Sequence, residues 1–296
     1  MLRFAPSPNG PLHLGHALSA LANERMAAAV GRPLTLRMED IDTARCRPQY
    51  TAAILADLEW LGIAWMPPLV RQSERFAHYH DALDALARRG LVAPSFATRR
   101  EVADHARRVG VPRDPNGAPR FPGDAAVIGE AEAARRRRTG EPAAWRLVMA
   151  RAAALTGEAG WTEVDEDGRN PRTVAGDALA WGDVILARKE VPTSYHLAAV
   201  VDDGADGATH VVRGADLFAA TAVHRVLQRL LDLSAPLYRH HGLVFGPDGR
   251  KLSKSNGATS LAALREAGVG PDEVRRTALA AEVRAHLAAP TPRERC

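Results

Sequence analysis

The opening of the chain constrains its fold more than any other segment. The stretch from Leu2 to Ala5 is short and partly apolar, as in a strand, and the proline- and glycine-rich run from Pro6 to Pro11 excludes regular structure. The Ala- and Leu-rich run from Leu12 to Val30 then predicts a helix. A strand, a rigid loop and a helix form the first unit of a parallel sheet with crossover helices.

The pattern continues downstream, which predicts an α/β fold with a Rossmann-like parallel sheet. Alternating apolar residues predict a strand at 33–38, and amphipathic spacing predicts helices at 50–61 and 74–89. Later in the chain we expect strands at 183–188, 195–202 and 210–213 and a helix at 217–231.

The middle of the chain interrupts this pattern. Its turns between Pro112 and Gly123 indicate an α+β insertion that splits the sheet. The expected organisation is a first half of the Rossmann-like domain at 1–91, an insertion at 92–174, a second half of that domain at 175–242, and a loop with a short helical C-terminus at 243–296.

Composition narrows the class of protein. The formal charge of +4 permits contact with a polyanion without demanding it, and a solvated helix face is favoured over phosphate binding for the basic run from Arg135 to Arg138. Two cysteines, Cys46 and Cys296, cannot form a disulfide framework. Without a signal peptide or a long apolar run, we expect a cytoplasmic protein with no membrane contact.

The tetrapeptide His13-Leu14-Gly15-His16 lies where the first loop enters the first helix. A helix N-terminus attracts anions, and two imidazoles three residues apart share one helical face. Gly15 leaves room for a flat ligand at the backbone. Alone, the tetrapeptide is equally consistent with an ordinary helix start, but the rigid loop before it favours an anion site.

A second candidate anion site is the glycine-flanked loop from Gly246 to Asn256. Lys251 and Lys254 supply positive charge and Ser253 a hydroxyl, which suits a triphosphate whose charge moves during reaction. A solvated loop is the alternative explanation for this segment by itself.

Together and in this order, the two elements resemble the HIGH and KMSKS signatures of class I aminoacyl-tRNA synthetases. Further blocks resemble glutamyl- and glutaminyl-tRNA synthetases and occur in the same order as in that family: 3–13, 36–42, 72–75, 195–203 and 212–217. The resemblance covers about residues 1 to 284.

The resemblance implies a site for ATP and glutamate. It places ATP at His13, Gly15, His16, Lys251, Ser253 and Lys254, with His13, His16 and Lys254 in catalytic roles, and glutamate at Arg3, Phe4, Ala5, Pro6, Ser7, Glu39, Tyr195 and Arg213. Arg3 and Arg213 suit carboxylates, and Glu39 suits the substrate ammonium. Core packing for Tyr195 and an ion pair of Arg213 with Asp216 or Asp202 remain alternatives. The α-carboxylate would attack the α-phosphate of ATP, and pyrophosphate would leave with Mg²⁺.

The chain also departs from its relatives in two places. Only 41 residues follow Ser255, too few for an anticodon-binding domain, which is similar to the glutamyl-Q tRNA(Asp) synthetase branch. That branch transfers glutamate to the queuosine base of tRNA(Asp). The positions where many relatives bind zinc hold Ser95, Ala97, Phe121 and Ala125, so we predict no zinc and no metal ligands.

The expected protein is therefore a monomer that binds ATP, Mg²⁺, L-glutamate and queuosine-bearing tRNA(Asp). A shortened synthetase that charges a tRNA 3′ end is one alternative. A non-catalytic paralogue that binds nucleotide or RNA is another.

Overall fold

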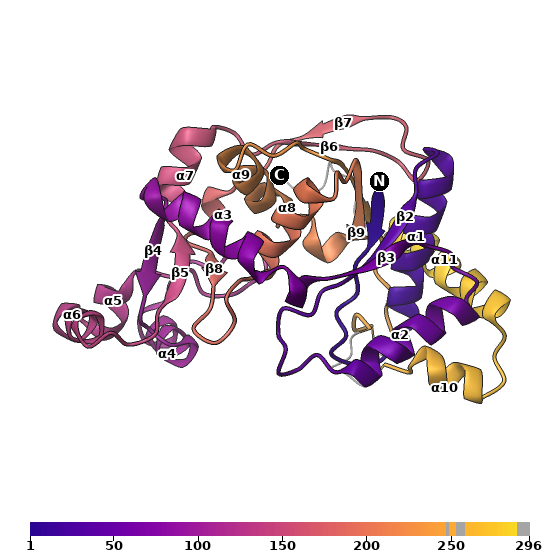
Figure 1. Cartoon of the computed structure of the whole chain (residues 1–296), viewed down its shortest axis with the longest axis horizontal. Helices are drawn as coiled ribbons and strands as arrows, with labels where there is room; N and C mark the ends of the chain where they lie inside the picture. The colour runs from indigo at the N-terminus through magenta and orange to yellow at the C-terminus, as the bar shows by residue number, and fades with distance from the viewer. Residues whose placement is uncertain (247–248, 253–257, 289–296) are drawn as a thin grey trace.

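The computed structural model describes residues 1–246, 249–252 and 258–288. At its centre, two sheets lie side by side and bring together strands from distant parts of the sequence (Figure 1). In spatial order these strands are β3 (Met66–Arg71), β2 (Leu34–Met38), β1 (Leu2–Phe4), β9 (His210–Gly214), β10 (Leu237–His241), β6 (Trp161–Glu163) and β7 (Arg172–Val174).

The two sheets meet at the N-terminus of the chain. The Thr209 amide donates to the Met1 carbonyl at 2.9 Å, and the Met1 amino group donates to the Gly207 carbonyl at 3.0 Å. Strands β1 to β3 and the group β9, β10 and β6 are paired in parallel, whereas β7 is antiparallel to β6. The predicted Rossmann-like α/β fold is therefore confirmed.

Helices cover both faces of the two central sheets, as expected when parallel strands are buried on both sides. Helices α1 and α11 contact each other on one face, and α8 and α9 contact each other on the opposite face. The helices of the chain are α1 (Leu14–Ala29), α2 (Pro48–Trp60), α3 (Phe76–Arg88), α4 (Arg99–Val109), α5 (Asp124–Ile128), α6 (Glu130–Arg138), α7 (Met149–Thr156), α8 (Tyr195–Ala205), α9 (Thr221–Leu230), α10 (Leu261–Glu266) and α11 (Pro271–Ala288). Short 3-10 turns occur at η1 (Gln72–Glu74), η2 (Leu179–Trp181) and η3 (Ala215–Leu217).

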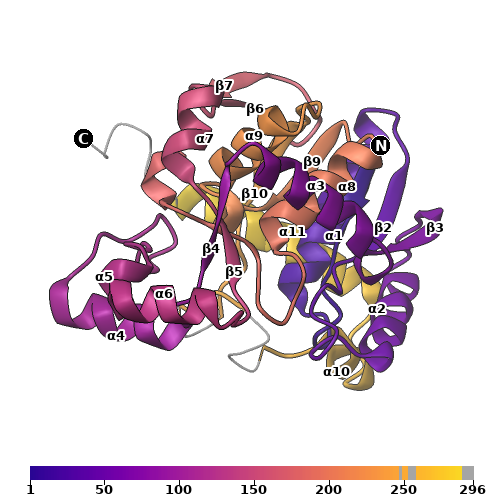
Figure 2. The ribbon, with the colours of Figure 1, turned by 60° about the vertical axis from the view of Figure 1, so that its left-hand side comes forward.

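A smaller antiparallel sheet forms the inserted part. It consists of β4 (Val92–Ser95), β5 (Ala144–Leu147) and β8 (Ile185–Ala187), and α4, α5 and α6 gather beside it at one end of the molecule (Figure 2). The strands are grouped into sheets differently from what an insertion at 92–174 would give. Strands β6 and β7 belong to the central sheet, while β8 returns to the inserted sheet.

One predicted strand is wrong. The apolar run at 195–202 forms helix α8 rather than a strand. A short continuous apolar run does not distinguish a buried strand from a buried helix by periodicity. Here the helix is buried between the sheet and α3 and α9, and its far end carries Asp202 and Asp203 into the protein interior. Strand β10 is an element that the sequence pattern did not predict.

Asp124 links the segments that hold the four positions compared above with a zinc site. Its carboxylate accepts hydrogen bonds from the amides of Phe96 and Ala97 at 2.8 and 2.9 Å and from the Ser95 hydroxyl at 3.3 Å. Asp124 directly precedes Ala125, one of the aligned zinc positions. One carboxylate at the start of α5 therefore fastens the loop after β4 through three hydrogen bonds.

The basic run at the end of α6 is largely paired within the insertion. Arg135 contacts Glu132 and Arg136 contacts Glu101, each at 2.7 Å, and the Arg137 guanidinium lies over the Phe96 ring. These pairs agree with the solvated-face interpretation. Across the described part of the chain, none of the helices has the length and apolar character needed to span a membrane.

Candidate active site

The two histidines at the start of α1 are oriented by backbone hydrogen bonds. The Gly15 amide donates to His13 Nδ1 at 3.1 Å, and the His13 amide donates to His16 Nδ1 at 3.2 Å. Because both Nδ1 atoms accept, each neutral ring carries its hydrogen on Nε2. The pair thus caps the helix at the positive end of its dipole.

Gly15 permits this arrangement. A Cβ atom at position 15 would lie 3.0 Å from the His13 ring, which is tighter than normal packing. The centroids of the His13 and His16 rings are 3.9 Å apart. A side chain at Gly15 would therefore disturb the two imidazoles.

A cavity of about 670 Å³ lies at the carboxyl ends of the strands and joins the two predicted ATP elements. Its walls include Ser7, His13, Gly15, His16 and Lys251. This is the edge of an open α/β sheet where ligands commonly bind. Ser253 and Lys254, which were also assigned to ATP, lie outside the described residues.

The chain beyond the second element returns to the first. Ser260 forms a β-bridge with His13, and the Leu261 amide donates to the Leu12 carbonyl at 2.9 Å. The Lys251 ammonium contacts the Asp216 carboxylate at 2.6 Å. Asp216 therefore pairs with Lys251 rather than with Arg213.

Arg213 is a buried cation whose direct partners are all neutral. Its guanidinium donates to the Tyr195 hydroxyl at 3.2 Å and to His224 Nδ1 at 3.1 Å, and Nε donates to His240 Nε2 at 3.1 Å. The remaining acceptors are the Thr221 hydroxyl and the Leu217 carbonyl. Arg213 is 5% exposed, and no carboxylate of the described residues lies within 4.0 Å of it.

The histidines around Arg213 are neutral. Burial and the charge of Arg213 hold the pKa of His224 well below its usual value, and the same two causes lower the pKa of His196 to about 4. Burial also lowers the pKa of His240, although its 2.5 Å contact with Glu163 opposes this shift. Glu163 thus acts on Arg213 through the imidazole of His240.

Arg3 has a partner that the sequence did not predict. Its Nε and Nη2 atoms contact the Asp203 carboxylate at 2.8 and 3.2 Å, and both side chains are buried. Burial favours the neutral form of Asp203, yet Arg3 and Arg37 outweigh this effect and lower its pKa to about 2. Asp203 is therefore an anion that fixes the orientation of Arg3.

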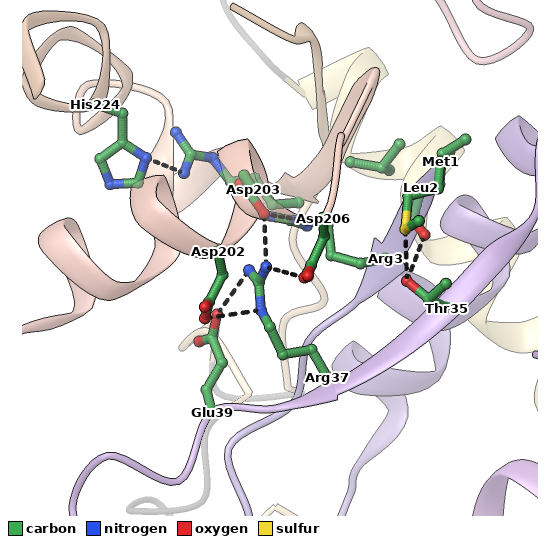
Figure 3. A network of polar contacts seen from close by, with 12 residues as sticks. Met1, Leu2, Arg3, Thr35, Arg37, Glu39, Asp202, Asp203, Asp206 and His224 are labelled. Atoms are coloured by element: carbon green, nitrogen blue, oxygen red, sulfur yellow. Dashed lines mark hydrogen bonds and ion pairs between the residues drawn. The ribbon is translucent and has the colours of Figure 1, made fainter. Parts of the chain in front are cut away.

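Glu39 lies in the same charged region, which Figure 3 shows around Arg37. One carboxylate oxygen of Glu39 is 3.6 Å from Arg37 Nη2, and burial raises the pKa of Glu39. Tyr195 lies within electrostatic reach of Glu39, Arg3 and Arg213; burial is the main cause of its raised pKa. The side chains predicted to hold glutamate at these four positions thus converge on one region.

The other positions assigned to glutamate differ in their surroundings. The Phe4 side chain packs in the core under α1, Ala5 is half-buried, and the Pro6 carbonyl accepts a hydrogen bond from the Glu39 amide at 3.0 Å. Ser7 lines the cavity that holds the histidines. Because its side chain is in the core, Phe4 could reach a ligand in the site only through its backbone.

Sequence reasoning missed Arg37, Asp203, His224 and His240 as members of the site. Arg37 and Asp203 stood in recognised blocks but had no assigned partner. His224 lies inside a helix and His240 in an unpredicted strand, so neither had a local signal. Only the folded chain brings them to Arg213.

The chain matches known proteins over nearly its whole length. Residues 1–281 match the family described as tRNA synthetases class I (E and Q), catalytic domain. A glutamyl-Q tRNA(Asp) synthetase of Rhodobacter capsulatus is 46% identical, covering 93% of this chain and 98% of the relative. One from Nocardia farcinica is 40% identical, covering 92% and 81%.

Solved structures agree with this relationship. The glutamate-tRNA synthetase of Elizabethkingia anophelis aligns with a TM-score of 0.67 and 27% identity over 86% of this chain. The present chain spans about half the length of that protein, 52%. A Mycobacterium tuberculosis methionyl-tRNA synthetase bound by methionyl-adenylate has a TM-score of 0.52 at 15% identity, a likeness of fold alone. The chain therefore belongs to the class I tRNA synthetases of the glutamate and glutamine family, together with the relatives named glutamyl-Q tRNA(Asp) synthetases.

Proposed function

We propose that this protein uses ATP to activate L-glutamate as glutamyl-adenylate and transfers the glutamate to the queuosine base in the anticodon loop of tRNA(Asp). The acceptor is supported by the names of two relatives, of which this chain covers 98% and 81%. We further propose that it acts in the cytoplasm as a monomer.

The observation that supports glutamate is the environment of Arg213. A buried cation with no direct counter-ion is costly unless an anion completes the site. The side-chain carboxylate of glutamate would take over the N–H now donated to the Tyr195 hydroxyl, and that hydroxyl could then donate to the carboxylate. Glutamine offers the same shape without the charge.

The cavity beside the two histidines fits ATP. In the reaction, an oxygen of the substrate α-carboxylate forms a bond to the α-phosphorus, and the bond from that phosphorus to the β-phosphate bridging oxygen breaks. Pyrophosphate leaves with its electron pair. The Nε2–H groups of His13 and His16 and the ammonium of Lys251 would stabilise the phosphate charge, and we assign Ser253 and Lys254 to the same triphosphate.

Mg²⁺ would enter with ATP. Within the described ranges, no group of three or more His, Cys, Asp or Glu side chains is arranged to hold a metal ion. Phosphate oxygens would therefore provide much of its coordination, which is the usual manner of Mg²⁺ binding beside nucleotides. Once bound, the ion would neutralise the leaving pyrophosphate.

Exchange of labelled pyrophosphate into ATP, measured with tRNA present, tests the activation step. We expect exchange with glutamate at least 100-fold faster than with glutamine, because the loss of a buried ionic contact costs about 3 kcal/mol. Equal exchange with both amino acids would contradict the role of Arg213. A lack of exchange with any amino acid would support a non-catalytic paralogue.

A further inference from the structure

Arg3 and Glu39, which we assign to the substrate, belong to one continuous set of buried charges. Glu39 faces Arg37 at 3.6 Å, Arg37 Nη1 donates to Asp203 at 2.8 Å, and Asp203 binds Arg3 at 2.8 Å (Figure 3). We call the four side chains Glu39, Arg37, Asp203 and Arg3 the charge relay. Arg37 is 1% exposed.

A second group of side chains surrounds Asp202, which lies next to Arg37 of the charge relay. Asp202 accepts hydrogen bonds from Gln72 at 2.7 Å, Tyr79 at 2.9 Å and Arg75 at 3.0 Å. Its remaining approach to Arg37 is 3.8 Å, too long for a hydrogen bond. Asp202 therefore has its hydrogen bonds from other side chains. It lies beside Arg37 without replacing Asp203 as the hydrogen-bond partner of Arg37.

The charge relay contains unused hydrogen-bonding capacity at Arg37 and Glu39. The Arg37 Nε and Nη2 atoms are buried without a hydrogen-bond partner. The Glu39 side chain is 16% exposed and accepts no hydrogen bond from the described residues. Arg37 therefore attracts Glu39 electrostatically but leaves its oxygens available for another donor.

The four side chains of the charge relay balance in charge, with two guanidinium groups and two carboxylates. Beside them, Arg75 pairs with Asp202 and Asp206. Glu39 is the carboxylate without hydrogen bonds, so a cation that donates N–H groups would bind there.

We propose that Arg37 and Asp203 are positioning residues that couple Arg3 to Glu39 and hold the Glu39 carboxylate, which has no hydrogen bond of its own, in place for the α-ammonium of the substrate. This inference rests on the proposed function, because it assigns the cation that Glu39 binds to glutamate. Arg37 and Asp203 act through their neighbours and do not contact ATP.

Asp203→Asn tests the relay. It keeps the size of the side chain but removes the anion shared by Arg3 and Arg37. We expect the KM for glutamate in pyrophosphate exchange to rise at least about tenfold, with the KM for ATP within about twofold of the wild-type value. A purely structural defect would change both constants or lower the amount of folded protein.

Asp206→Asn is the matched control. It removes the same charge, but Asp206 contacts Arg75 at 2.8 Å, is 3.7 Å from Arg37 and does not contact Arg3. Its glutamate KM should rise less than about threefold. Equal effects of the two substitutions, or an unchanged glutamate KM in Asp203→Asn, would overturn the relay.

A second variant covers the case in which Asp203→Asn does not fold. Arg37→Lys keeps the charge but has one terminal nitrogen in place of the two that face Asp203 and Glu39, so it should also raise the glutamate KM alone. An unchanged glutamate KM in Arg37→Lys would reject the relay as well. If the proposed function itself were wrong, the wild-type protein would show no glutamate-dependent exchange, which is a different result from an unchanged KM in a variant.

Discussion

Replacing Arg213 by alanine is expected to lower kcat/KM for glutamate by about 10²–10³-fold while ATP binding persists. The substitution removes a buried cation whose direct hydrogen-bond partners are neutral, and loss of a buried charge partner costs about 3–5 kcal/mol. The ATP cavity is lined by Gly214 and Asp216 but not by Arg213. Pyrophosphate exchange and equilibrium ATP binding measure the two effects separately.

Arg229→Ala provides the control for this prediction. Arg229 lies on the same helix as His224 but donates to the carbonyls of Thr156 and Glu158 at the protein surface. Its removal should change kcat/KM less than about twofold, as is usual for surface substitutions. Arg213→Ala with near-normal glutamate activation would refute the assigned role of Arg213.

His16→Ala is expected to lower kcat by about 10²–10³-fold with little change in the KM for glutamate. Removing a single donor that stabilises charge in a transition state commonly costs that much. The hydrogen bond from the His13 amide fixes the His16 ring, so its Nε2–H is oriented before ATP arrives. Single-turnover formation of glutamyl-adenylate measures the effect on the chemical step.

His80→Ala is the matched control, because His80 is an exposed residue of α3 away from the cavity. It should retain wild-type kcat. If His16→Ala also retains wild-type kcat, the helix start only caps α1 and does not act on the phosphates.

Local patterns predict the first half of the fold well. The loop from Pro6 to Pro11 separates a strand from a helix because its residues cannot continue either one, and α1 begins at Leu14, two residues after the predicted start. Helix α2 begins at Pro48, two residues before the predicted start, where proline is favoured, and the alternation in β2 follows from an equally local rule. These elements needed no knowledge of their neighbours.

Other elements depend on tertiary context. The valines of α8 favour a strand locally, but burial against α9 and the pairing of Asp203 with Arg3 select the helix. Strand β10 joins β6 and β9, which are far from each other in the sequence, so no local pattern identifies its place.

The candidate site could likewise be predicted only in part from local patterns. Family motifs indicated Arg3, Glu39, Tyr195 and Arg213, but not which of the arginines would have a counter-ion. In the structure Asp203 binds Arg3, whereas Arg213 meets two histidines, a tyrosine and a threonine. That distinction arises from long-range contacts, which residue spacing does not determine.

Transfer of labelled glutamate to tRNA(Asp) with and without queuosine tests the central claim most directly. The protein, ATP and labelled glutamate are incubated with each tRNA, and the tRNA is then cleaved to locate the label. We predict label only on queuosine-bearing tRNA, in its anticodon fragment, and none on tRNA first treated with periodate, which cleaves the cis-diol of queuosine. Equal labelling of both tRNAs at their 3′ ends would contradict the proposed acceptor and support a shortened synthetase.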